Sequence, residues 1–240
     1  SQSGTGRIHC HVASAYDNCS PACFYGRQII VAVCLHKIVP RQEFICRIYS
    51  VQVFARNTHK TRQSGAAADK DGNFWFTNAL QNYGLIVRRK DGSWKSFRTD
   101  TGNEELYTLI IDSVHNYKWF LGHNDIFVHD GENKFAHVNP NKGSKLATTK
   151  VNCLAQDQDN EIWLGTEKGI KVIYNTSNAF ENGGNGEESP ITCNNILYSE
   201  GGNIEYLLAY EEITCITVDG ANRKWIGTAS GGAFLVSENG

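Results

Sequence analysis

Methionine is absent from the sequence, proline is scarce and long apolar runs are missing. The 240 residues include no Met and only 4 Pro, so we expect a processed form or a piece of a longer protein. The longest apolar run, residues 29–35, is far shorter than the ~18 residues that a membrane-spanning helix needs. It also lacks the basic start and cleavage site of a signal peptide. We therefore expect no membrane span in this chain.

Motifs for catalysis and metal binding are missing as well. The sequence has no nucleophile elbow, phosphate loop, zinc-binding helix or EF-hand loop. Asp157 and Asp159 resemble calcium ligands, but the rest of a 12-residue loop is absent, and we interpret them as turn residues. Four histidines lie within residues 115–137, but the other repeat units have no His at the corresponding positions. A metal-dependent propeller lyase therefore ranks third among the functions that we consider. We expect no enzyme activity and no cofactor.

Two different compositions meet near residue 65. Residues 1–64 contain eight Lys or Arg against two Asp or Glu, five of the eight Cys and no Trp. Residues 65–240 contain 15 Lys or Arg against 23 Asp or Glu and all five Trp. Their net charge of −8 argues against nucleic-acid binding, since a nucleic-acid interface is basic. The two parts need separate interpretations.

Residues 1–64 carry no repeat and leave three interpretations open. A zinc or disulfide module could use its cysteines, but they form no Cys-x-x-Cys pair. A divergent or poorly ordered blade would explain the lack of a repeat. Translation in the wrong reading frame would explain the abnormal composition. We leave this segment unassigned; DNA sequencing of the region tests the third interpretation.

Residues 65–240 contain a segment that recurs four times. Each copy has an Asp six residues before a Trp, or seven in the second copy, and the intervals between the Trp residues are 44, 44 and 62. The first two intervals match the ~40–50 residues of a propeller blade with four short strands. The longer interval places an insertion at residues 182–203, which we expect to be a loop. The repeat residues are Asp69, Trp75, Asp112, Trp119, Asp157, Trp163, Asp219 and Trp225.

The repeat predicts an all-β fold, a partial β-propeller of about four blades with four antiparallel strands each. Apolar residues alternate with period 2. The Asp and the Gly or Asn that follows it are typical of a tight turn, and the Trp is expected to fill the gap between neighbouring blades. Cys153 and Cys215 fall on equivalent inner strands, where buried free thiols are expected. The expected blades span about residues 65–105, 106–148, 149–210 and 211–240.

The pattern of Asp, Trp, Gly and Thr in these copies resembles the two-component regulator propeller repeat. The fourth copy, residues 206–236, is further similar to the PorZ family of surface components of the type IX secretion system. This resemblance implies a location on the cell surface in association with the outer membrane. It also implies a sortase-like partner in the attachment complex and a link to anionic lipopolysaccharide. The chain would then be a fragment that acts in cargo attachment without catalysis.

A candidate ligand surface lies in the first copy. Arg88 and Arg89 form a small basic run, and Trp94 is the one Trp outside the repeat position. Together they could bind lipopolysaccharide or another glycan, although Trp94 could equally serve outer-strand packing. The alternative function is a periplasmic sensor propeller of a hybrid two-component regulator that recognises a glycan. The part of the gene beyond codon 240 would discriminate the two: a β-sandwich favours the first, a transmembrane helix with a kinase the second.

Overall fold

The computed structural model divides the chain into two compact units, Ser1–Thr58 and His59–Gly240, which are considered separately. The structure describes residues 65–78, 82–99, 101, 106–122, 125–148, 150–200 and 202–237, together with three strands of the first unit. No helix among these residues has both the length and the apolar character needed to cross a membrane.

The first unit contains one antiparallel sheet in the order β1-β2-β3. Its strands are Ala22–Tyr25, Gln28–Ala32 and Ile48–Val51. The side chains of this unit, including its five cysteines, lie outside the described residues. The three interpretations of residues 1–64 therefore stay predictions.

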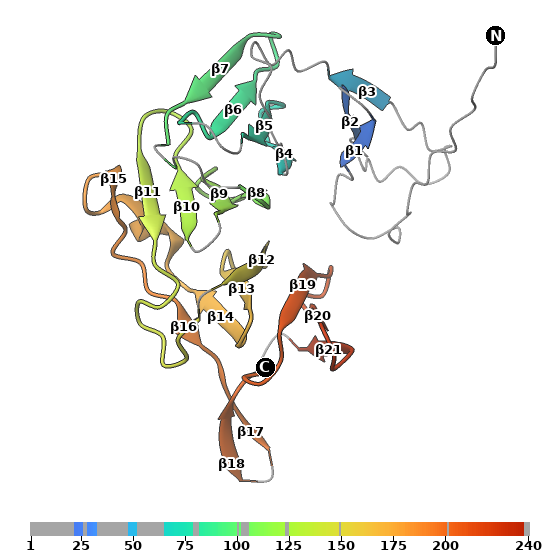
Figure 1. Ribbon diagram of the computed structural model, residues 1–240, viewed down its shortest axis with the longest axis vertical. Helices are drawn as coiled ribbons and strands as arrows, with labels where there is room; N and C mark the ends of the chain where they lie inside the picture. Colours follow the sequence, from blue (N-terminus) through green and yellow to red (C-terminus); the bar gives the residue numbers. More distant parts are fainter. Residues whose placement is uncertain are drawn as a thin grey trace, which may run out of the picture. The chain divides into compact units, whose positions relative to one another are not determined.

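Four antiparallel sheets follow one another along the second unit, and we call them blades 1 to 4 (Figure 1). Blade 1 comprises β4 (Ala66–Ala68), β5 (Phe74–Thr77), β6 (Leu85–Arg88) and β7 (Trp94–Phe97). Blade 2 comprises β8 (Leu109–Ile111), β9 (Lys118–Leu121), β10 (Ile126–His129) and β11 (Phe135–Val138). Blade 3 begins with β12 (Val151–Gln156), β13 (Ile162–Thr166) and β14 (Gly169–Ile173). Blade 4 comprises β19 (Ile213–Val218), β20 (Lys224–Thr228) and β21 (Ala233–Val236).

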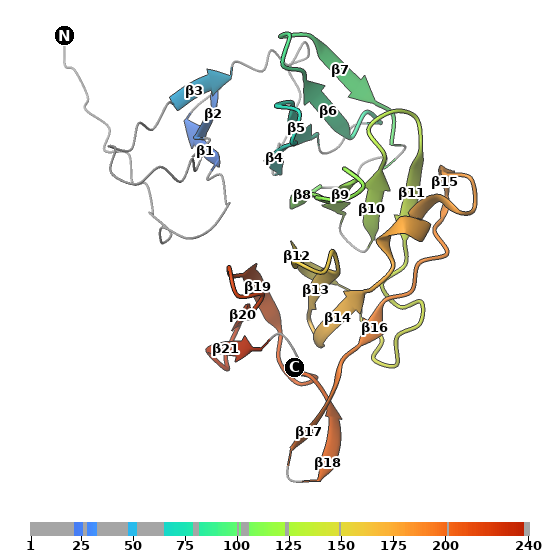
Figure 2. The same ribbon diagram turned by 180° about the vertical axis from the view of Figure 1, so that it is seen from behind.

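This architecture is the predicted one, a nearly all-β partial propeller. In each sheet the strands follow in sequence order. The first strands β4, β8, β12 and β19 therefore each form one edge of their sheet (Figures 1 and 2). Among the described strands, blade 4 has three strands rather than the four expected per blade.

Neighbouring blades pack face to face through apolar side chains. Trp75 of blade 1 packs against Phe120 and Phe127 of blade 2. Trp119, on the opposite face of blade 2, packs with Leu154 and Ile162 of blade 3. Trp163 repeats this arrangement toward blade 4. Because strand side chains alternate between the two faces, the repeat Trp residues of blades 1 to 3 each point toward the blade that follows.

The insertion at residues 182–203 is not the simple loop that we expected. It contains β15 (Asn185–Glu188), β16 (Asn194–Asn195), β17 (Leu197–Glu200) and the first residue of β18 (Asn203–Tyr206). β16 pairs with β14 and provides the fourth strand of blade 3, whereas β15 pairs in parallel with β11 and extends blade 2. β17 and β18 form a separate hairpin (Figure 1). The segment was mistaken for a loop because its Gly- and Asn-rich strands lack apolar alternation.

Candidate functional site

The repeat Asp accepts a hydrogen bond from the indole N–H of its own Trp in three of the four blades. The Nε1–Oδ2 distances are 2.8 Å for Trp75 and Asp69, 3.0 Å for Trp163 and Asp157, and 3.1 Å for Trp225 and Asp219. A buried Trp needs such a partner for its N–H group. The six-residue spacing brings the two groups together because the Asp directly follows one strand and the Trp lies in the next.

The same carboxylates hold the turn that joins the two strands. Asp157 Oδ1 accepts the backbone N–H groups of Asp159 at 3.1 Å and Glu161 at 2.9 Å. The third residue after the Asp has a positive φ, 84° at Gly72 and 66° at Asn160, where Gly and Asn are tolerated. Both oxygens of Asp157 therefore accept hydrogen bonds, Oδ1 from the turn backbone and Oδ2 from the Trp163 indole.

These hydrogen bonds also affect proton binding by Asp69. Burial alone would raise the pKa of its carboxyl group. The hydrogen bonds from Trp75, Asn73 and the turn backbone outweigh burial, so the pKa of Asp69 lies below its ordinary value. Hydrogen bonds to the charged form of a carboxyl group have this effect.

Blade 4 supplies a lysine to the Asp–Trp pair of blade 3. Lys224 Nζ lies 3.0 Å from Asp157 Oδ2, and both side chains are almost fully buried. The same ammonium group lies 4.8 Å from the centroid of the Trp163 ring. A buried carboxylate is thereby neutralised, and a desolvated cation–π contact is added. We call this arrangement an Asp–Trp–Lys junction.

Blade 2 likewise places a lysine against the repeat Trp of blade 1. Lys118 Nζ lies 4.2 Å from the centroid of the Trp75 ring and donates a hydrogen bond to the carbonyl oxygen of Asn116 at 2.6 Å. Burial lowers the pKa of Lys118, and the carboxylates of Asp69 and Asp130 oppose that shift. We did not predict these two lysines, although Lys118 and Lys224 both stand directly before a repeat Trp, in otherwise apolar strands.

The junction between blades 2 and 3 departs from this pattern. Asp112 lies seven residues before Trp119, and its Oδ2 contacts His115 Nδ1 at 3.2 Å instead of the indole. Trp119 is fully buried, and its Nε1 has no hydrogen-bond partner among the described residues. The residue of blade 3 that corresponds to Lys118 and Lys224 is Ile162, which packs with Trp119. The extra residue places the positive φ at Asn116, four residues after the Asp.

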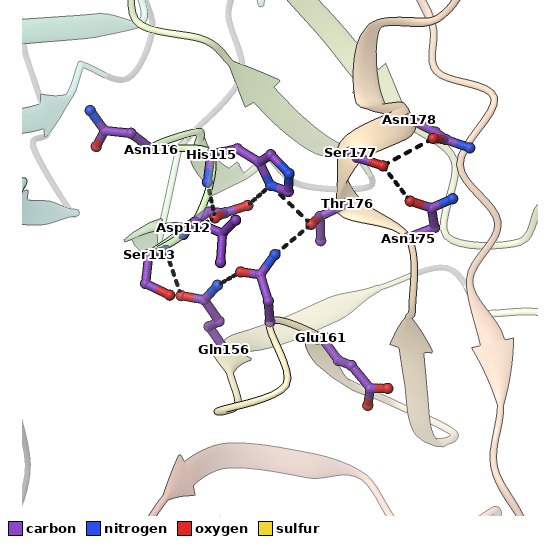
Figure 3. A network of polar contacts seen from close by, with 12 residues as sticks. Asp112, Ser113, His115, Asn116, Gln156, Glu161, Asn175, Thr176, Ser177 and Asn178 are labelled. Carbon is purple, nitrogen blue, oxygen red and sulfur yellow. Dashed lines mark hydrogen bonds and ion pairs between the residues drawn. The ribbon is translucent and has the colours of Figure 1, made fainter.

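A chain of polar contacts joins the two blades at this junction (Figure 3). His115 Nδ1 lies 3.4 Å from Thr176 Oγ1, which accepts a hydrogen bond from Asn160 Nδ2 at 3.0 Å. Asn160 Oδ1 accepts from Gln156 Nε2, and Gln156 Oε1 accepts from the backbone N–H of Ser113 at 3.0 Å. The contacts therefore connect the turn of blade 2 to that of blade 3 through Thr176, the first residue of the 3₁₀ helix η1 (Thr176–Phe180).

The histidines of blade 2 occupy separate positions. His129 is buried at the junction with blade 1, where its ring meets Phe97 edge-on at 4.6 Å between centroids. Its Nδ1 accepts the backbone N–H of Gly131 at 2.8 Å, and burial lowers the pKa of His129 to about 4. His115 belongs to the polar network at Thr176, and His123 lies outside the described residues. Within the described part of the chain, no three His, Cys, Asp or Glu side chains form a group suited to a metal ion.

The cysteines of the described residues are free thiols. Cys153 lies opposite Gly165, and Cys215 lies opposite Gly227. A Cβ atom on Gly165 would come within 2.4 Å of the Cys153 sulfur. This explains why the residue two positions after the repeat Trp is glycine. Cys153 is buried, but Cys215 is exposed, contrary to the expectation for equivalent strands. Cys215 shares its face of blade 4 with Trp225, and no described element covers that face.

The candidate ligand residues of blade 1 meet on neighbouring strands. Arg88 of β6 lies directly opposite Trp94 of β7, so both side chains belong to the same face of the sheet. This face is opposite to the one that carries Trp75. Trp94 is 43% exposed, and its ring stacks on Phe76 with centroids 6.1 Å apart. Arg89 lies in the following turn and is exposed, and neither arginine has an ion pair with any described residue.

Comparison with known proteins supports the same fold. A family model of the two-component regulator propeller matches residues 145–168. No curated protein sequence matches the chain. The chain therefore carries the two-component regulator propeller repeat, as the resemblance predicted, and folds as a partial β-propeller.

Among solved structures, the chain is similar to PorZ, described as an essential bacterial surface component of the type IX secretion system of Porphyromonas gingivalis. The TM-score is 0.66 at 18% identity, over 88% of this chain and 31% of PorZ. A second similar structure is the extracellular domain of a protein described as a hybrid two-component system of B. thetaiotaomicron, with a TM-score of 0.51 at 12% identity, over 91% of this chain and 28% of that one. YCF48 from Cyanidioschyzon merolae has a TM-score of 0.50 at 11% identity, over 90% of this chain and 65% of its own. The chain thus spans less than a third of the first two relatives.

Proposed function

We propose that this chain belongs to a cell-surface propeller that acts by binding, without catalysis, in the attachment of type IX secretion cargo. The observation that carries this proposal is the fold, which is similar to PorZ over 88% of the chain. The junctions between the blades add support, since they hold the sheets as a rigid support for exposed loops. The expected partners are a sortase-like protein of the attachment complex and an anionic lipopolysaccharide.

The surface formed by Arg88, Arg89 and Trp94 is the proposed contact with the lipopolysaccharide. Guanidinium groups bind phosphate and carboxylate groups in bidentate geometry. An exposed indole offers a flat apolar face to a sugar ring. The two arginines are available for this contact because neither has an ion pair with a described residue.

Binding of purified lipopolysaccharide to the immobilised chain tests this site. We expect anionic lipopolysaccharide to bind, with an affinity that falls as salt increases. The double variant Arg88→Ala/Arg89→Ala should weaken binding about tenfold or more. The matched control is Lys145→Ala/Lys150→Ala, which removes two exposed positive charges from another part of the chain. Equal binding by the two double variants would rule out this surface.

Deletion of the gene in the source bacterium tests the cellular function. If the chain acts in cargo attachment, secreted cargo should move from the cell surface to the medium. A second candidate function is ligand sensing, which is favoured by the match to the regulator repeat and by the similarity to an extracellular sensor domain. In that case cargo should stay attached, and transcription of glycan-responsive genes should change instead.

A further inference from the structure

A small cavity lies beside the 3₁₀ helix, between blade 3 and the insertion. Its volume is about 170 Å³, and it is lined by Tyr174, Asn175, Asn178, Pro190, Ile191, Thr192 and Asn194. Tyr174 directly follows β14, and Asn194 lies in β16, the strand that pairs with β14. The cavity is therefore built on a hydrogen-bonded sheet, which fixes the positions of its walls. Pockets for drug-sized ligands occupy ~300–1,000 Å³, so this one suits a single small ring.

Two amide groups at the cavity are oriented with their donors free. Ser177 Oγ donates to Asn175 Oδ1 at 2.6 Å and also approaches Asn178 Oδ1 at 3.1 Å. Both amide nitrogens point away from Ser177 (Figure 3), and no described residue accepts a hydrogen bond from either. Each Nδ2 can donate two hydrogen bonds. Thr192 adds a hydroxyl group, which can donate or accept.

An exposed aromatic ring forms one wall of the same cavity. The side chain of Tyr174 is 53% exposed although the residue directly follows the buried strand β14. Burial and the Glu161 carboxylate both raise the pKa of the Tyr174 hydroxyl group. The group therefore stays protonated and can both donate and accept a hydrogen bond. An apolar ring face next to amide and hydroxyl groups matches the C–H face and the hydroxyl groups of a pyranose.

The charges around the cavity exclude an anionic ligand. None of the seven lining side chains is ionisable at neutral pH. The nearest carboxylates include Glu161 beside Tyr174 and Glu188, two residues before Pro190. The Lys142 ammonium group is already used, since it pairs with Glu188 at 3.3 Å and donates to the Ser189 carbonyl oxygen. An acidic sugar or a phosphate group would meet these carboxylates, and none of the lining side chains carries a positive charge to offset the repulsion.

We propose that this cavity binds one neutral sugar residue of a glycan, stacked on Tyr174 and hydrogen-bonded by Asn175 and Asn178. The site is separate from the proposed lipopolysaccharide surface, and its ligand is neutral rather than anionic. The two proposals can therefore fail independently. Substitutions of Arg88 and Arg89 should leave neutral-sugar binding unchanged.

Saturation-transfer NMR followed by calorimetry tests the site on the whole chain. The probes are neutral oligosaccharides of glucose, mannose, galactose and N-acetylglucosamine, with an oligogalacturonate as the anionic comparison. We expect at least one neutral oligosaccharide to bind, with a Kd on the order of 1 mM, as small contact areas give weak affinity. The oligogalacturonate should not bind at this cavity. If none of the neutral oligosaccharides binds the folded chain, the proposal is wrong.

Two variants decide whether binding occurs at this cavity. Tyr174→Ala should weaken binding at least tenfold, and the matched control Tyr83→Ala should not, because Tyr83 is equally exposed at 52% on blade 1. Asn175→Asp should have the same effect as Tyr174→Ala, because it removes a donor and adds a negative charge at an exposed position that is not expected to affect folding. Full binding by both Tyr174→Ala and Asn175→Asp would overturn the proposal.

Discussion

The junction between blades 3 and 4 and the junction between blades 2 and 3 are built from the same repeat but use different chemistry. The first neutralises Asp157 with Lys224 and pairs the Trp163 indole with the carboxylate. In the second, one additional residue in the turn separates Asp112 from Trp119, and no residue that the structure describes accepts a hydrogen bond from the indole N–H. An apolar residue, Ile162, takes the place of the lysine.

This comparison shows that the parts of the repeat change together. Asp157 bonds Trp163 and is buried, so it needs the cation that Lys224 of the following blade supplies, because a buried carboxylate without compensation is costly. Asp112 contacts His115 instead of Trp119, and blade 3 accordingly has Ile162 where the other junctions have a lysine. The polar network through Thr176 then takes over the connection between the two blades (Figure 3).

Replacing Trp163 by alanine should have the largest effect. Trp163 is 6% exposed between two blades, whereas Trp225 is 46% exposed on the uncovered face of blade 4. Trp163→Ala should lower the free energy of unfolding by about 3–5 kcal/mol, and Trp225→Ala by about 1 kcal/mol, because far less buried surface is lost. Urea unfolding followed by circular dichroism measures both. Equal losses would mean that Trp163 does not stabilise the contact between blades 3 and 4.

Removal of the junction lysine should cost almost as much. Lys224→Met leaves Asp157 buried without its cation, and we expect a loss of about 3 kcal/mol in urea unfolding. The matched control is Ile162→Met at the corresponding position of blade 3, which should cost less than about 1.5 kcal/mol. If the two substitutions cost the same, the ion pair is not needed in the junction.

The junction between blades 1 and 2 should respond to pH through His129. Its pKa is lowered from 6.5 to about 4 in the folded chain, so only the unfolded chain binds the proton between these values. The free energy of unfolding should therefore fall as pH decreases from 6.5 toward 4. Between pH 7 and pH 5, His129 should account for a loss of up to about 2 kcal/mol.

His129→Gln is the control for this pH dependence. Its amide oxygen can still accept the Gly131 N–H group, but it does not titrate. Urea unfolding at pH 7 and pH 5 should show a smaller difference for this variant than for the original chain. The same difference in both proteins would show that other groups cause the pH dependence.

Replacing Trp by Phe should give the smallest effect and separates the indole hydrogen bond from the packing of the ring. Trp163→Phe loses the bond to Asp157, whereas Trp119→Phe loses no hydrogen bond to the described part of the chain, where Trp119 Nε1 has no partner. Trp163→Phe should therefore cost about 1–2 kcal/mol more than Trp119→Phe. Thermal unfolding of the two variants side by side measures this difference. A larger cost for Trp119→Phe would contradict our description of the junction between blades 2 and 3.

The fold could be predicted because its signals are local. The six-residue spacing between Asp and Trp, with a Gly or Asn in the turn, specifies two strands and the connection between them. The candidate ligand surface could be partly predicted for the same reason, since Arg88 and Trp94 flank one short turn and pair across it. The cavity at Tyr174 could not be predicted, because Tyr174 and Asn194 are brought together by strand pairing across the insertion.

The sequence by itself determined the repeat, the class of fold and the turn at each Asp, because these depend on neighbouring residues and their backbone preferences. Only the tertiary structure decided which lysine serves which Trp, since Lys224 reaches Asp157 across the contact between two blades. It also decided that residues 185–188 and 194–195 are strands. These short polar segments become strands because the edges of β11 and β14 offer them backbone hydrogen bonds, and that opportunity is not encoded in their own composition.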